Sequence, residues 1–146
     1  MVLSPVKSEW DKVSFSSTLF LCPIVDRLLS IVPGKWHAEI RLGLQEALVN
    51  AAKHGNNLDP HKQVNVRFWF EEGSCWWIIS DEGSGFQPPE RNRQELSGLP
   101  HVESESGRGM FLLNQIFDRV VWNRQGTEIS LCKQLSAQID REPLLL

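Results

Sequence analysis

The chain has 146 residues, of which 41% are hydrophobic and 23% are charged, so it is long enough for one domain with a core and too short for two. Its formal net charge of −3 gives no overall attraction to nucleic acid, so direct nucleic-acid binding is not expected. Cys22, Cys75 and Cys132 lie outside CxxC spacing, and no leader-like start or membrane-length apolar stretch is found. We therefore expect a cytoplasmic protein with reduced, buried thiols and no membrane association.

The first half of the chain predicts one strand and two helices. Residues 13–20 alternate apolar and hydroxyl side chains, which is typical of a strand. Residues 23–32 have apolar side chains at helical spacing, and Pro33-Gly34 ends this helix. A longer helix is predicted over residues 35–54, with Gly55 placed for a left-handed cap.

The second half predicts two hairpins with one helix between them. The elements are expected in the order strand, strand, helix, strand, strand, at residues 63–72, 74–82, 109–117, 118–124 and 127–135. The polar segment from Gly83 to Arg108 is longer than usual for a loop in a compact domain. Such a segment is typically a lid or a binding loop.

This order of elements predicts an α+β two-layer sandwich, with a mixed, mainly antiparallel sheet and helices on one face. We expect residues 10–136 to form a single domain, with residues 1–9 and 137–146 as terminal extensions. Hairpins dominate, so the βαβ unit of a dinucleotide-binding fingerprint is not expected, and no P-loop sequence is found.

Three polar residues, Glu46, Asn50 and His54, recur four apart on the otherwise apolar helix. Such a stripe on its own is most often a solvated helix edge. A metal site made of all three is disfavoured, because the first and last are separated by about 12 Å of helix. A third interpretation is that they line one wall of a nucleotide pocket.

Two glycine pairs bracket the polar segment. Gly83 and Gly85 follow a strand that ends in Asp81, although an isolated Asp-Glu-Gly is most often a plain turn. Gly107 and Gly109 precede a predicted helix, whose first amides would point toward a phosphate. Arg108 lies between these glycines and would add a charge-assisted contact.

The three segments EALVNAAKHG, DEGSGF and SGRGMFLL resemble the N, G1 and G2 boxes of the Bergerat-fold (GHKL) ATPases in content and order. They are most similar to the bacterial anti-sigma factor serine kinases, over about residues 10–135. The resemblance implies a histidine-kinase-like ATPase fold that uses ATP and Mg²⁺. It implies that Asn50 ligates Mg²⁺, that Glu46 is the general base, and that Asp81 reads the adenine amine. The other implied nucleotide contacts are Lys53, His54, Gly55, Asn56, Gly83, Gly85, Phe86, Gly107, Arg108, Gly109 and Met110.

The same resemblance implies a homodimer that binds a sigma factor and phosphorylates an anti-anti-sigma (antagonist) protein in a partner-switching pathway. One alternative is a nucleotide-dependent binding module without significant kinase activity, acting on a partner other than a sigma factor. Another is a degenerate domain that binds no nucleotide. His37, in a His-x-Glu sequence, is disfavoured as a phosphoacceptor because it lies on the same predicted helix as Glu46.

Overall fold

The computed structural model describes residues 10–85 and 105–135, with side chains described from residue 109 in the second range. The helices are α1 (Cys22–Leu28), α2 (His37–Val49) and α4 (Glu105–Ile116), and the strands are β1 (Asp11–Ser16), β2 (Gln63–Glu71), β3 (Ser74–Ser80), β4 (Arg119–Trp122) and β5 (Glu128–Gln134). Short 3-10 turns, η2 (Leu29–Ile31) and η3 (Gly34–Trp36), connect α1 to α2, and a π-helical turn, η4 (Asn50–Gly55), follows α2.

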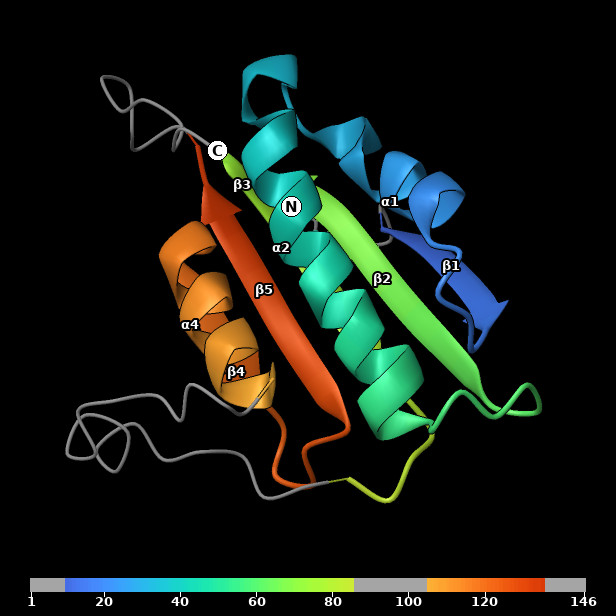
Figure 1. Cartoon of the computed structure of the whole chain (residues 1–146). Helices are drawn as coiled ribbons and strands as arrows, with labels where there is room; N and C mark the ends of the chain where they lie inside the picture. The colour runs from blue at the N-terminus through green and yellow to red at the C-terminus, as the bar shows by residue number, and fades with distance from the viewer. Residues whose placement is uncertain (1–9, 86–104, 136–146) are drawn as a thin grey trace, which may run out of the picture.

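The five strands form one sheet in the order β1-β2-β3-β5-β4. Every strand pair among the described residues is antiparallel. The helices α1, α2 and α4 lie side by side on the same face of this sheet (Figure 1). The predicted two-layer α+β fold and the predicted order of elements are therefore confirmed.

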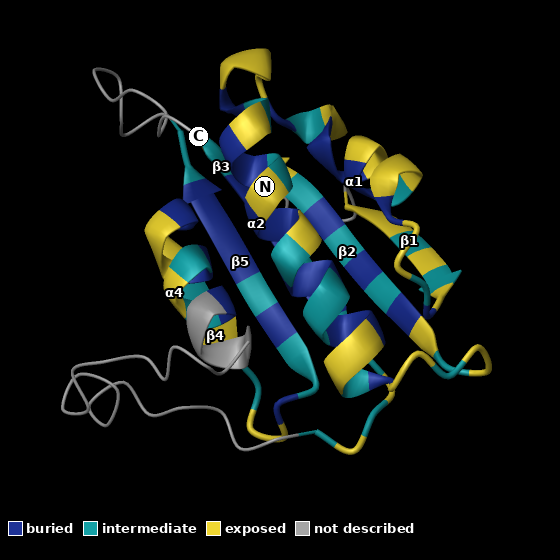
Figure 2. Ribbon diagram, viewed as in Figure 1, coloured by how far each residue is buried: buried dark blue, intermediate teal, exposed yellow. Residues whose placement is uncertain are grey.

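The core lies between the sheet and the helices, as the burial pattern in Figure 2 shows. Alternate residues of β2 and β3 are buried because side chains along a strand point to opposite faces. They meet a buried stripe on α2 whose members recur at helical spacing. The buried residues of these three elements include Val64, Val66, Phe68, Cys75, Trp77, Ile79, Ile40, Leu44 and Leu48.

The turn between β2 and β3 is a two-residue hairpin turn, as the glycine there suggested. Glu72 and Gly73 both have positive φ, at 50° and 81°. Such turns match the twist of the flanking strands, and glycine adopts the second conformation without strain.

Several predicted boundaries were wrong. The first strand is β1 at Asp11–Ser16 rather than residues 13–20, and the helix predicted over residues 35–54 is a 3-10 turn, α2 and a π turn. Gly55 is not a left-handed cap, because the residues with positive φ after the turn are Asn57 and Leu58. Helix α4 begins at Glu105, because glycine weakens a helix by only about 1 kcal/mol and does not stop it.

The thiols also differ from the expectation that all three are buried. Cys22 is exposed, whereas Cys75 and Cys132 are buried. Burial raises the pKa of Cys75 to about 12, so that thiol is not reactive near neutral pH. Within the described residues, no helix has the length and apolar character needed to cross a membrane.

Helices α2 and α4 approach closely at Gly43. A Cβ added there would lie 2.5 Å from the ring of Phe117 and 3.2 Å from a methyl group of Ile116. The Phe117 ring is itself held edge-on against Trp77, with centroids 5.8 Å apart. The ring therefore has little freedom to move away from a larger residue at position 43.

We predict that Gly43→Ala destabilises the protein. Overpacking costs about 1–3 kcal/mol, and the better helix propensity of alanine returns about 1 kcal/mol, so a net loss of about 1 kcal/mol is expected. Urea unfolding measures it. Gly34→Ala is the control, because nothing lies within 4 Å of a Cβ there. A Gly43→Ala protein as stable as the wild type would contradict this packing.

Candidate functional site

The segments singled out in the sequence meet at one end of the molecule. The turn η4 after α2, the strand end at residues 81–85, the turn between β4 and β5, and the N-terminal part of α4 all lie at the lower end in Figure 1. Residues far apart in the sequence are thereby brought together without any contribution from the opposite end of the sheet.

The π turn changes the predicted stripe of polar residues. The amide of Asn56 donates to the carbonyl of Ala51 at 2.9 Å, five residues back instead of four. Helical spacing therefore relates Glu46 to Asn50 but does not carry on to His54. Single π turns are frequent at functional sites, since they re-aim side chains without ending the helix. Asn50 is half-buried, and Lys53 and His54 are exposed.

The π turn packs closely against the residues that follow β3, through glycines on both sides of the contact. A Cβ on Gly55 would overlap the carboxylate of Asp81, and a Cβ on Gly83 would overlap the carbonyl oxygen of Gly55. The amide of Gly83 donates to Asp81 Oδ1 at 2.8 Å. Gly55 and Gly83 are therefore required by close approach, and together they hold the Asp81 carboxylate in place.

Asp81 sits in an environment that disfavours its charge. Burial raises its pKa above 3.8, and the hydrogen bond from Gly83 and the charge of Lys62 act in the opposite direction. Its backbone amide donates to the carbonyl of Thr127 at 2.9 Å. Hydrogen bonds thus hold both the backbone and the carboxylate of Asp81. This half-buried carboxylate is suited to accepting a hydrogen bond from a ligand amine.

The turn between β4 and β5 forms part of the same site, which the sequence prediction missed. Asn123 Oδ1 accepts the amide of Thr127 at 2.9 Å, and Asn123 Nδ2 donates to Thr127 Oγ1 at 3.0 Å. Gly85 has φ of +88°, and a Cβ there would overlap the carbonyl oxygen of Gln125. The available signal was the Asn-x-x-Gly-Thr turn sequence between two predicted strands.

Asn56 does not line the mouth of the site, which corrects the expectation for this residue. Its side chain is fully buried and uses both ends of its amide within the protein. The nitrogen donates to Ser17 Oγ at 2.9 Å and to the carbonyl of Gln63 at 3.0 Å. The oxygen accepts the amide of Glu82 at 2.7 Å. Asn56 therefore holds the residues that follow β3 in place, through the amide of Glu82.

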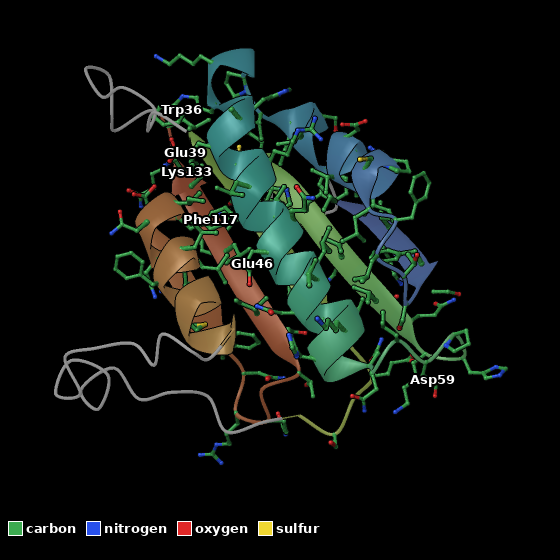
Figure 3. All side chains as sticks on the ribbon, in the orientation of Figure 1. Trp36, Glu39, Glu46, Asp59, Phe117 and Lys133 are labelled. Carbon is green, nitrogen blue, oxygen red and sulfur yellow. The ribbon has the colours of Figure 1, made fainter. Side chains whose placement is uncertain are left out.

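The side chain of Glu46, a residue of α2, lies between α2 and α4, as Figure 3 shows. A Cβ on the buried Gly109 would overlap Glu46 Oε2, so the glycine lets α4 pass directly against this carboxylate. Met110 follows and is half-buried. Glu46 and Gly109, predicted as members of one site, are thus brought into contact.

The start of α4 corrects one expectation about anion binding. The amides of Met110 and Phe111 were expected at a helix N-terminus, but α4 begins at Glu105, so both lie past its first turn. Gly107 and Arg108 belong to α4, and the Arg108 side chain is not among those described. Phe86 falls outside the described residues.

The side chains at this site differ from those of a metal centre that is built from protein ligands alone. Among the described residues, no group of three or more histidine, cysteine or acidic side chains is arranged to hold a metal. Mg²⁺ needs only one or two protein oxygens when substrate phosphates and water supply the rest. One amide oxygen on Asn50 fits that requirement.

We predict that Asp81→Asn raises the free energy of unfolding at neutral pH. Because the folded-state pKa lies above 3.8, the ionised carboxylate costs stability at neutral pH, and this cost disappears as the pH falls toward 3.8. The advantage of the variant over wild type should therefore shrink on acidification, as followed by urea unfolding. Asp11→Asn, at an exposed carboxylate, is the control and should change stability by less than about 0.5 kcal/mol. A variant that is less stable at neutral pH would contradict this account of Asp81.

Comparison with known proteins agrees with this geometry. The family model for the histidine kinase-like ATPase domain matches residues 24–133. An anti-sigma F factor of Geobacillus kaustophilus is 31% identical over 101 residues, covering 67% of this chain and 69% of that protein. A second, from Geobacillus sp., is 33% identical over 101 residues, with the same coverage. The serine-protein kinase RsbW of Bacillus subtilis is 28% identical over 106 residues, covering 68% and 66%. The chain belongs to the histidine kinase-like ATPase family, in the branch that contains the anti-sigma F factors and the serine-protein kinase RsbW.

Proposed function

We propose that this protein is an ATP- and Mg²⁺-dependent protein serine kinase that also binds a sigma factor. Its phosphoryl acceptor is a serine on an antagonist protein, as in a partner-switching pathway. The observation that carries the proposal is the assembly of Glu46, Gly109, Asp81 and the site glycines at one end of the fold. The names of the relatives, anti-sigma F factor and serine-protein kinase RsbW, point to the same activity.

The adenine of ATP binds at the Asp81 end of the site in this proposal. The Asp81 carboxylate accepts a hydrogen bond from the exocyclic amine of the base, which excludes guanine because guanine presents a carbonyl at that position. The missing side chains at Gly55, Gly83 and Gly85 let the protein backbone pack closely around Asp81, which positions its carboxylate for the base. The Asn123–Thr127 turn holds Asp81 from the opposite side through the carbonyl of Thr127.

The phosphates lie toward the start of α4. Asn50 would hold Mg²⁺ through its side-chain oxygen, and the ion would supply charge neutralisation at the phosphates. Lys53 on the π turn adds positive charge near the same end, and His54 follows it with a further hydrogen-bonding side chain. Gly107, Arg108 and Gly109 contact the phosphates from α4.

Glu46 acts as the general base. It lies about one turn before Asn50 on α2, so it is near the phosphate end and away from the adenine end. It orients the serine hydroxyl of the antagonist and accepts its proton as the oxygen attacks the γ-phosphorus. The bond from that phosphorus to the β–γ bridging oxygen breaks, and ADP leaves. Gly109 leaves the space that this carboxylate needs.

The proposed assembly is a homodimer formed through the first strand and helix. β1 is an edge strand of the sheet, and an edge presents unpaired backbone groups to a second chain. Leu19 and Phe20, between β1 and α1, are 51% and 72% exposed. These features support the surface named here.

A binding module without significant kinase activity is the alternative, and Glu46 separates the two. We predict that Glu46→Gln lowers the rate of phosphoryl transfer by about 100-fold or more, because only the proton acceptor is lost. The dissociation constant for ADP should stay within about two-fold, because Gln keeps the shape of Glu beside Gly109. Transfer of labelled phosphate to the antagonist, and calorimetric titration of ADP, measure the two effects. Equal transfer by the variant and the wild type would reject Glu46 as the base.

We also predict that Asn50→Ala removes the effect of Mg²⁺ on ATP binding. The wild type should bind ATP more tightly when Mg²⁺ is present, and the variant should bind with the same affinity in either condition. Titrations of ATP and ADP with and without Mg²⁺ test this. The Asp81→Asn variant is the control, since it should weaken nucleotide binding equally with and without the ion. Unchanged Mg-ATP binding by Asn50→Ala would contradict the assignment of the metal ligand.

A further inference from the structure

Lys133 of β5 is fully buried at the end of the helix layer opposite the proposed ATP site. Its Nζ donates to Glu39 Oε2 at 2.8 Å and to the carbonyl of Ile116 at 2.7 Å. The same ammonium lies 4.8 Å from the centre of the Trp36 ring. Figure 3 shows Trp36, Glu39 and Lys133 gathered near the N-terminal end of α2, away from Glu46.

Stability alone does not explain this ion pair. Both side chains are 0% exposed, so two charges have been removed from water. Apolar residues of similar volume in such positions usually give an equal or higher stability. What an apolar pair lacks is the hydrogen bond to the carbonyl of Ile116, which is the last residue of α4.

The C-terminal end of α4 is fixed by several contacts besides this one. The Phe117 ring fills the space over Gly43, and the amide of Asp118 donates to the carbonyl of Cys132 at 2.8 Å. Lys133 adds a charged contact to the carbonyl of Ile116 at the helix end, where a cation is favoured. This end of α4 is therefore tied to α2 and to β5.

The contacts at the two ends of the α2–α4 pair are equally far apart along both helices. Glu39 and Glu46 are seven residues apart on α2, and Gly109 and Ile116 are seven residues apart on α4. Each spacing is about 10 Å of helix. Besides the contact at Gly43, the helices meet at Glu39–Lys133–Ile116 at one end and at Glu46–Gly109 at the other.

We propose that Lys133 is a positioning residue, which sets where α4 lies along α2 and so holds the Gly109 segment against Glu46. The proposal rests on the proposed kinase function for its effect on transfer. Its effect on α4 itself is independent of that function. A shift of α4 along its axis would move the phosphate end of the site relative to the base and leave the Asp81 end in place.

The test is the double variant Glu39→Met/Lys133→Met, which removes both charges and keeps the volume. We expect stability at or above that of the wild type in urea. The amides of residues 109–116 should exchange with deuterium about ten-fold faster, because the tie at Ile116 is lost. The kcat for transfer should fall about ten-fold or more, with the KM for ATP and the affinity for ADP little changed. Leu131→Met, a conservative change at a buried residue of the same strand, should leave all of these unchanged.

The proposal is overturned if a stable double variant exchanges like the wild type, or if Leu131→Met loosens α4 as much. If the wild type itself transfers no phosphate, the kinase function fails, and the exchange measurement still decides the role of Lys133.

Discussion

The contact of Gly55 with Asp81 and Gly83 is the constraint on which the proposed site depends. At both glycines a Cβ would overlap the facing group, which is the Asp81 carboxylate at Gly55 and the Gly55 carbonyl at Gly83, so η4 and the residues after β3 pack together only because both positions lack a side chain. This contact fixes a carboxylate whose burial raises its pKa. A raised carboxylate pKa beside close backbone contacts is consistent with the role proposed for Asp81 in binding a ligand.

A second constraint acts between the helices. Glu46 touches α4 through Gly109 at one end, and the buried Lys133 ties Ile116 to Glu39 at the other. In the proposed site, adenine recognition and phosphate chemistry therefore depend on different parts of the fold, the first on the end of the central strand β3 and the second on the placement of α4. A nucleotide with its base at Asp81 and its phosphates near Gly109 would therefore fit only when α4 is correctly placed.

Much of the fold followed from local patterns. Alternation in β2 and β3 and a glycine between them were enough to predict a hairpin, and the order of elements predicted the two layers. The three motif segments also predicted that Glu46, Asp81 and Gly109 belong to one site. The extent of the helices did not follow, because the π turn at residues 50–55 and the early start of α4 depend on tertiary packing. The buried Lys133 and the supporting role of Asn56 were missed because their partners lie 94 and 39 residues away in the sequence.

The central claim is that ATP binds where η4, the end of β3 and α4 meet. Its most direct test is the change in amide NMR signals of the ¹⁵N-labelled chain on addition of ADP. The account predicts that the largest shifts fall on Gly55, Gly83 and Gly85. The indole signal of Trp69, which donates to Glu71 and stacks on Trp76, should not move. Unchanged glycine signals, together with shifts elsewhere on the sheet, would contradict it.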